Sequence, residues 1–182
     1  LDVIVAPSFE TLARDGLSAR KGNKCRLVSN GALATLNRKS LDVRARFRFV
    51  RGGFLRQPNY TFIPNFENSS IERHGDISTH EMGDLLLACA IGSTSNSNTV
   101  TLARDGMLIG NGVGQQDRVG ACMLALRRAY DAGHSTIGAA AYSDSFFPFV
   151  DGPEVLANAG VTTIFASSGS VRDAEIKEFC AV

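Results

Sequence analysis

The pattern of apolar and polar positions along the chain predicts strands that alternate with helices. Residues 43–49 alternate Val, Arg, Ala, Arg, Phe, Arg and Phe, which is the period of two expected for a half-buried strand. Gly52 and Gly53 end this pattern, and residues 57–76, rich in Pro, Asn and Ser, are predicted to form a loop. Further strands are predicted at Leu1–Ala6, Lys24–Ser29, residues 137–142 and Val161–Ala166. We expect the first of these to be buried.

Apolar residues that recur at intervals of three and four predict helices between the strands. Ser78 and Glu81 fit a capping box at the start of one helix, whose apolar side carries Leu85. Another helix repeats apolar residues over 119–130 and stops at Gly133. The remaining helices are predicted from Pro7 to about Arg20, from Asp151 as the cap with Pro153 in the first turn, and after Ser170.

A hairpin is predicted in the middle of the chain. Thr99–Leu102 and Met107–Ile109 have strand character, and Arg104-Asp105-Gly106 between them is typical of a tight turn. Gly110–Gln116 follows as a glycine-rich loop before the next helix. Strands that alternate with helices, together with a hairpin, predict an α/β fold with a mixed sheet.

Composition is that of one ordinary globular domain, with 182 residues, 44% hydrophobic and 20% charged. The net charge of +1 does not favour nucleic acid or a membrane surface as a partner. No apolar run approaches the roughly 18 residues of a transmembrane helix. The cysteines at 25, 89, 122 and 180 have no CxxC spacing, so no zinc or dithiol centre is indicated, and a reduced, cytoplasmic compartment is the simplest interpretation.

Three polar loops are candidates for a binding site, because each lies where a strand ends and ligands of open α/β sheets bind in that region. In Ser95–Asn98, clustered Ser and Asn are common in turns, and Asn98 also offers a neutral amide, donor and acceptor, to a substrate carbonyl. The Gly110–Gln116 loop is either a plain glycine turn or, with Arg118 and the helix N-terminus beside it, suited to an anion such as a phosphate.

The third loop, Ser143–Asp151, carries three phenylalanines around a proline. Apolar anchoring to the core explains one or two of them, and the others are suited to a flat heterocycle. Spacing alone does not say which is which. His74, His80 and His134 show no metal-ligand or triad spacing and are expected to be ordinary surface residues.

Three motifs stand in the same order as in AICAR transformylase domains. They are SNTVTLARDGMLIGNGVGQQDRV at 97–119, SDSFFPFVDG at 143–152 and SSGSVRDAEI at 167–176. LDVIVAPSF at 1–9 and RGGFLRQ at 51–57 also resemble that domain, so the resemblance covers nearly the whole chain. It implies that residues 1–182 are the second cytidine-deaminase-like α/β/α half of such a domain, a fragment without the first half and the extreme carboxy terminus.

The resemblance implies an activity: transfer of a formyl group from 10-formyltetrahydrofolate to the 5-amino group of AICAR ribonucleotide in purine biosynthesis, by a cytoplasmic homodimer. In the family this domain usually belongs to a bifunctional enzyme that also has IMP cyclohydrolase activity. There, a Lys-His pair in the first half supplies the main acid/base groups, and no Lys-His dipeptide occurs in this chain. The alternative is a non-catalytic half-domain that binds the nucleotide or the folate without turnover.

Site residues follow from the same resemblance. The resemblance assigns catalytic positioning to Asn98 and substrate binding to Arg118, Phe146 and Asp151. It assigns binding of the folate co-substrate to Pro148 and Phe149, and binding of a structural potassium ion to Asp144. Zinc is not expected, because the zinc deaminases that share this fold need His-x-Glu and Pro-Cys-x-x-Cys motifs, which the sequence lacks.

Overall fold

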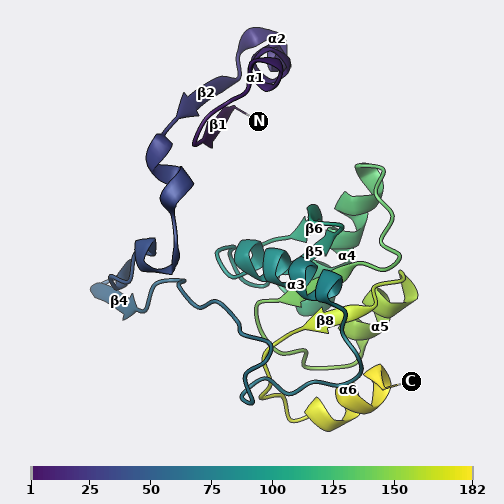
Figure 1. Cartoon of the computed structure of the whole chain (residues 1–182). Helices are drawn as coiled ribbons and strands as arrows, with labels where there is room; N and C mark the ends of the chain where they lie inside the picture. Colours follow the sequence, from purple (N-terminus) through teal and green to yellow (C-terminus); the bar gives the residue numbers. More distant parts are fainter. Residues whose placement is uncertain (1, 182) are drawn as a thin grey trace. The chain divides into compact units, whose positions relative to one another are not determined.

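The computed structural model describes residues 2–181. Leu1, the first residue of the predicted strand Leu1–Ala6, and Val182 lie outside the described part. The chain divides into two compact units, one up to Thr61 and one from Phe62 onward, which are described separately (Figure 1). No helix in the described part is both long and apolar enough to cross a membrane. The expected α/β class with a mixed sheet is confirmed, whereas the cytidine-deaminase-like fold stays a prediction.

The first unit begins with a parallel strand pair joined through helices. Its elements are β1 (Val3–Ala6), α1 (Thr11–Ser18), α2 (Arg20–Asn23), β2 (Arg26–Ser29), and two short 3₁₀ helices, η1 (Gly31–Thr35) and η2 (Arg38–Ser40). The expectation that the first strand is buried is wrong, since Val3 and Val5 are more than half exposed. A two-stranded sheet with two short helices offers too few neighbours to cover an apolar strand.

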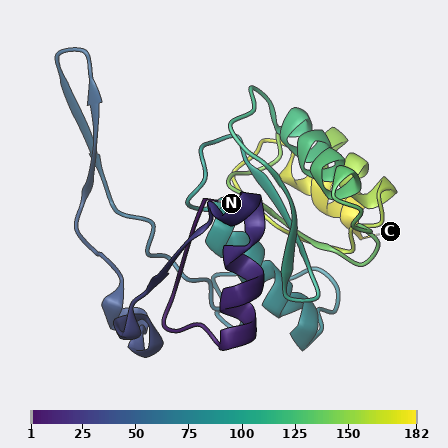
Figure 2. The same ribbon diagram turned by 90° about the horizontal axis from the view of Figure 1, so that it is seen from above.

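The first unit ends in an antiparallel hairpin of β3 (Arg46–Val50) and β4 (Gly53–Gln57), drawn in blue in Figure 2. The predicted alternation has the right phase, because Phe47 and Phe49 share one face and Phe47 packs edge-on against Phe54 at 5.2 Å between ring centroids. The predicted half-burial is wrong, since all of β3 is exposed. The strand β4 was not predicted, because its Gly-Phe-Leu-Arg-Gln sequence does not alternate.

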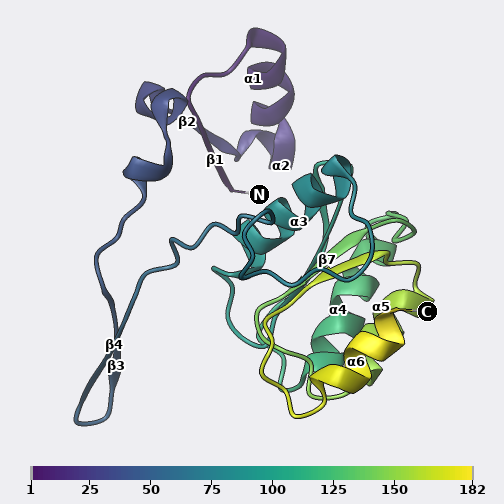
Figure 3. The same ribbon diagram turned by 60° about the horizontal axis from the view of Figure 1, so that its bottom comes forward.

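The second unit is a three-layer sandwich. Its elements are α3 (Thr79–Gly92), β5 (Val100–Arg104), β6 (Met107–Gly112), α4 (Arg118–Asp131), β7 (Ala140–Ser143), α5 (Asp151–Asn158), β8 (Thr163–Phe165) and α6 (Asp173–Cys180). The sheet order is β6-β5-β7-β8, with β7 and β8 parallel and the other pairs antiparallel. In Figure 3, α3 lies on one face of this sheet and α4 and α5 on the other.

Alternation along the strands builds two cores, one on each face of the sheet. Val100 and Leu102 of β5 point toward α4 and α5, where Cys122 and Leu156 belong to the same buried cluster. On the α3 face, the buried cluster contains Phe66, Leu85 and Ala140. The predicted helix faces are confirmed at Leu85 of α3 and Cys122 of α4, and the cysteines of both helices are buried free thiols. The predicted apolar run over 119–130 is only partly right, because Met123 and Tyr130 are 58% and 76% exposed while alanines of α4 face the sheet.

Two glycines of β6 allow α4 to pack against the sheet at very close range. A Cβ atom at Gly110 would lie 2.2 Å from the carbonyl oxygen of Ala125, and one at Gly112 would lie 2.0 Å from that of Ala121. Both glycines belong to the strand, not to the predicted loop. The absence of a side chain at these two positions is a packing requirement, because any side chain would collide with the backbone of α4.

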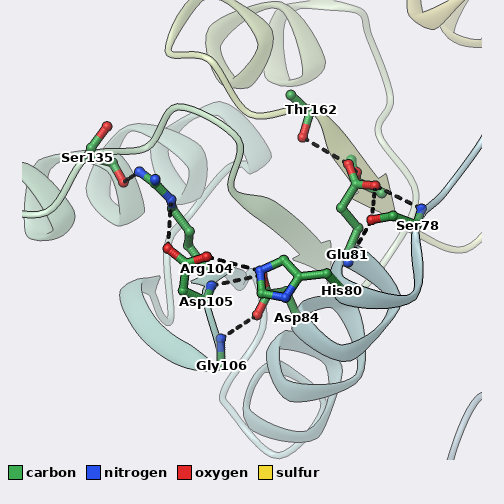
Figure 4. Close-up of polar contacts among 10 residues, drawn as sticks. Ser78, His80, Glu81, Asp84, Arg104, Asp105, Gly106, Ser135 and Thr162 are labelled. Atoms are coloured by element: carbon green, nitrogen blue, oxygen red, sulfur yellow. Dashed lines mark hydrogen bonds and ion pairs between the residues drawn. The ribbon is translucent and has the colours of Figure 1, made fainter.

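The start of α3 ties together three segments that are distant in sequence (Figure 4). Ser78 and Glu81 form the predicted capping box, and Glu81 Oε1 also accepts a hydrogen bond from the hydroxyl of Thr163 in β8 at 2.9 Å. Asp84 is buried and accepts the backbone N–H groups of Asp105 and Gly106 in the β5–β6 turn, at 3.0 and 2.8 Å. These carboxylates therefore fix the hairpin turn and β8 to one helix.

Replacing Gly112 with alanine should destabilise the protein by about 3 kcal/mol, since the added methyl group must displace α4 from the sheet. Urea unfolding followed by circular dichroism measures this. Gly83→Ala is the matched control: a Cβ at Gly83 in α3 meets nothing within 4 Å, and alanine is the better helix former, so stability should stay equal or rise slightly. Equal losses for both variants would contradict the close packing.

The stabilisation that Glu81 provides should depend on pH. Hydrogen bonds, above all from the Ser78 hydroxyl and then the Ser78 backbone, lower the pKa of Glu81 from 4.5 to about 2. Because the folded state holds this carboxylate ionised, its contribution is complete above pH 4.5 and is lost as the pH falls toward 2. The stability gap between the wild type and Glu81→Gln, measured in urea at several pH values, should narrow over that range. A gap that does not vary with pH would exclude this role.

Candidate functional site

The strand register brings all the candidate loops to one edge of the sheet in the second unit. Val100, at the start of β5, lies opposite Gly112 at the end of β6 and opposite Ser143 at the end of β7. Because β8 runs parallel to β7, its carboxyl end reaches the same edge. The loops that contain Asn98, Arg118 and the three phenylalanines therefore emerge side by side, as the sequence-based site requires.

Asn98 is held from one side by the loop that follows β6. Its backbone exchanges two hydrogen bonds with Gln115, at 3.2 and 3.1 Å, after a cis peptide bond between Ser97 and Asn98. Its side-chain nitrogen donates to the carbonyl oxygens of Gln115 and Gln116, at 2.9 and 3.2 Å. Carbonyl oxygens only accept, so this orientation of the amide is the favourable one. Both N–H donors are engaged within the protein, and the Asn98 side chain can offer a ligand only its oxygen as an acceptor.

Arg118 and Asp144 form a buried ion pair beneath this loop. Arg118 is the first residue of α4 and is only 7% exposed, and its Nη1 donates to Asp144 Oδ1. Nη1 also lies 3.4 Å from the carbonyl oxygen of Thr99. Among the described residues, Arg118 Nε is the one buried side-chain polar atom without a hydrogen-bond partner. An unpaired buried donor is unfavourable, so this N–H is suited to an acceptor that the chain itself does not supply.

Asp144 stays ionised in this environment. Burial raises the pKa of its carboxyl group, but hydrogen bonds from the Ser97 hydroxyl, the Thr99 backbone and Arg118, with the charge of Arg118, outweigh burial and leave the pKa below its ordinary value. The Thr99 N–H donates to Asp144 Oδ1 at 2.8 Å. Oδ1 of Asp144 therefore already accepts two N–H donors, one of them cationic. This oxygen does not fit a potassium ligand, because a cation beside it would lie against the guanidinium of Arg118.

The N-terminus of α4 carries an anion of its own. The side chain of Asp117 caps the helix and accepts the Gly120 N–H at 2.5 Å, and Arg118 is directed to Asp144. Gly110 and Gly112 serve helix packing, and Gly114 adopts a positive φ of 68° in the turn. Of the two alternatives for this loop, the structure favours packing and turn formation over the phosphate-like site.

The aromatic loop after β7 divides into one anchor and two exposed rings. Phe147 is 3% exposed and belongs to the core cluster, where Gly152 leaves room for its ring. Phe146 and Phe149 are 37% and 50% exposed. The guanidinium of Arg172 lies over the Phe149 ring at 5.0 Å from the centroid, so this ring is held on one face by a cation. The question that spacing left open is thus answered: Phe147 is the anchor.

Asp151 lies at the start of α5, but not as the cap that the sequence predicted. The structure makes Val150 the N-cap, without a side-chain hydrogen bond, and Asp151 the first helical residue. Asp151 is exposed and its Oδ1 accepts the N–H of Gly152 at 2.8 Å. Pro148 is half-buried between the exposed phenylalanines. Both residues therefore stand on the same loop as Phe146 and Phe149, beside α5.

A cavity of about 620 Å³ opens at the carboxyl ends of β7 and β8. Asp144 and Phe147 line it, together with Tyr142 and Ser167, whereas Asn98 does not. Its size is within the range of small-molecule sites. Asp144 is thus the predicted site residue that connects the cavity with the Asn98 loop.

Cysteines and histidines do not form a reactive centre in the described part of the chain. Within residues 2–181, no three His, Cys, Asp or Glu side chains converge as a metal site. Burial raises the pKa of Cys122 to about 12, so its thiol stays protonated and unreactive. His80 Nε2 lies 3.0 Å from Asp105 Oδ1 at the start of α3 (Figure 4). Asp105 belongs to the β5–β6 turn, at the opposite end of these strands from the candidate loops.

The groups that hold the site in place have no signal in the residue pattern of the sequence. The carbonyl oxygens of Gln115 and Gln116 and the N–H of Thr99 are backbone atoms, which no residue pattern identifies. The pairing of Arg118 with Asp144 spans 26 residues and depends on the sheet register. Asp117, by contrast, had a signal, because an aspartate directly before a helix is a common cap.

Comparison with known proteins agrees with the motifs. A model of the AICARFT/IMPCHase bienzyme family matches residues 1–128. This chain belongs to that family. The bifunctional purine biosynthesis protein PurH of Bacillus cytotoxicus is 36% identical over 174 residues, which are 95% of this chain and 32% of that protein. PurH of Bacillus cereus strain AH187 is 37% identical over 174 residues, which again are 95% of this chain and 32% of that protein. The chain therefore spans about a third of the length of these relatives.

Removing the anchor of the aromatic loop should cost far more stability than removing an exposed ring. Phe147→Ala leaves a cavity in the core and should destabilise the protein by about 3 kcal/mol or more. Phe149→Ala removes a half-exposed ring and its contact with Arg172, which is worth about 1 kcal/mol at most. Urea unfolding of both variants measures the difference. Similar losses for the two would show that Phe149 is also part of the core.

Proposed function

We propose that this chain is the substrate-orienting part of a purine-biosynthesis enzyme that transfers a formyl group from 10-formyltetrahydrofolate to the 5-amino group of AICAR ribonucleotide. The observation that carries the proposal is the convergence of Asn98, Arg118 and the Phe146–Phe149 loop at one sheet edge, in a member of the AICARFT/IMPCHase family. The names of the PurH relatives support the pathway.

Asn98 has the geometry to orient the attacking amine. The 5-amino group is a weak nucleophile, because the imidazole carboxamide withdraws its electrons. With both donors of Asn98 engaged by Gln115 and Gln116, its side-chain oxygen accepts an N–H of the amine. This hydrogen bond directs the nitrogen lone pair to the formyl carbon and stabilises the positive charge that develops on nitrogen during attack.

The surrounding residues would bind the two substrates. Arg118 offers its unpaired Nε–H to an acceptor of the nucleotide, and Phe146 and Asp151 contact the same substrate from the aromatic loop. Pro148 and Phe149 meet the pterin of the folate. Arg172, which lies over Phe149, places positive charge near a co-substrate whose glutamate carries carboxylates.

The Lys-His pair to which the family resemblance assigns proton transfer is not part of this chain. Formyl transfer passes through a tetrahedral oxyanion and releases a proton from the amine, which calls for a general base and a cationic or N–H donor. No Lys-His dipeptide occurs in the 182 residues. We therefore assign the main acid/base groups to another part of the enzyme, which we propose to be a cytoplasmic homodimer with a site assembled from several segments.

Asn98→Ala tests the assignment. In the complete enzyme that carries these residues, turnover should fall by about 100-fold while the Kd of AICAR ribonucleotide changes little, because the lost hydrogen bond matters most when the amine attacks. Asn158→Ala, at the exposed end of α5, is the control and should leave both quantities unchanged.

Three results distinguish the possible functions. Formyl transfer that depends on Asn98 supports the proposal. An unchanged kcat in Asn98→Ala would contradict the role of this residue. Calorimetric binding of AICAR ribonucleotide or folate without any turnover would instead favour a non-catalytic binding half-domain, which the absent Lys-His pair also fits.

A further inference from the structure

The carboxylate of Asp144 stands where three segments of the second unit meet. Asp144 follows β7 directly, Thr99 precedes β5, and Arg118 begins α4. The side chain of Asp144 is 14% exposed and that of Arg118 is 7% exposed, so both charges lie largely out of water. Charges in such surroundings are stable only when they are paired and hydrogen-bonded, and each of these two is the other's partner.

Asp144 fixes Thr99 at both of its backbone polar groups. The Thr99 N–H donates to Asp144 Oδ1 at 2.8 Å, and the Asp144 N–H donates to the Thr99 carbonyl oxygen at 3.1 Å. Thr99 directly follows Asn98 and Ser97 directly precedes it. The Ser97 hydroxyl also hydrogen-bonds to Asp144. Asp144 thus holds the two neighbours of Asn98 by hydrogen bonds, whereas Gln115 and Gln116 hold Asn98 itself.

We propose that Asp144 is a positioning residue of this site: its carboxylate orients the Arg118 guanidinium and the Ser97–Thr99 segment together, and so sets the direction of the Asn98 amide. The proposal rests on the function proposed above. It assigns Asp144 a role different from potassium binding, since a cation at Oδ1 would lie against the guanidinium of Arg118.

The charge of Asp144 is the feature to remove. Asp144→Asn keeps the shape and an acceptor oxygen but loses the negative charge, which leaves Arg118 buried without its ionic partner. Asp131→Asn is the matched control, because Asp131 lies at the opposite end of α4, is exposed, and forms an ion pair with Arg127 on the surface. Both substitutions change the net charge by the same amount.

Two measurements on the full 182-residue chain report on positioning. Hydrogen exchange followed by NMR should show the Thr99 amide exchanging about tenfold faster in Asp144→Asn, because a charge-assisted hydrogen bond becomes a neutral one. Calorimetry with AICAR ribonucleotide should show affinity falling by about tenfold. Asp131→Asn should change neither quantity. Unchanged Thr99 exchange and affinity in Asp144→Asn would overturn the proposal.

A double-mutant cycle separates positioning from a general loss of stability. Arg118→Lys keeps the charge but not the planar donor geometry, and alone it should also weaken nucleotide binding by about tenfold. If Asp144 acts through Arg118, the double variant should bind about as well as either single variant, because each change already breaks the same unit. A combined loss near 100-fold would show that the two residues act independently, and would overturn the proposal.

The remaining outcomes identify what has failed. If the wild-type chain binds no AICAR ribonucleotide, the proposed function of the chain fails, while the Thr99 exchange still decides whether Asp144 holds this segment. If the wild type binds and Asp144→Asn binds equally well, the positioning role fails alone. The titrations are run in potassium chloride and in choline chloride. An Asp144→Asn effect confined to potassium would make this residue a cation ligand and overturn the proposal.

Discussion

The candidate site depends on one constraint, the register of β5 against its two neighbours. Val100 lies opposite Gly112 on one side and Ser143 on the other, so the segment before β5 and the segments after β6 and β7 must emerge together. A shift of one residue would turn Asn98 away from Gln115 and separate Asp144 from Thr99. The packing of Val100 and Leu102 against α4 and α5 opposes such a shift, because it would expose the core. Hydrophobic packing thus determines where the polar groups meet.

Charge compensation then determines how those polar groups are oriented. Arg118 is buried at the start of a helix, where the positive end of the helix dipole makes a further cation unfavourable. Asp117 on the helix end and Asp144 from the next strand offset this. The same two carboxylates also accept the backbone N–H groups of Gly120 and Thr99. The residues that balance the charge of Arg118 therefore also fix the backbone of the site.

Residues within a single motif carry different tasks. In the aromatic loop, Phe147 anchors the chain in the core, whereas Phe146 and Phe149 stay exposed. In the glycine-rich segment, Gly110 and Gly112 admit the backbone of α4, and the following Gln115 and Gln116 engage Asn98 through their carbonyl oxygens. Substitutions a few positions apart should therefore affect stability in one case and binding in the other.

Sequence by itself determined the alternation of strands and helices, the capping box at Ser78, the hairpin turn at Asp105, and the family, because these depend on neighbouring residues or on shared motifs. Tertiary structure decided the rest. Contacts between distant segments determine which phenylalanine is buried and why β6 needs glycine. They also bring Arg118 to Asp144. Burial of β1 and β3 was predicted wrongly for the same reason: an apolar or alternating pattern shows which side chains could form a buried face, but only a neighbouring element can cover that face.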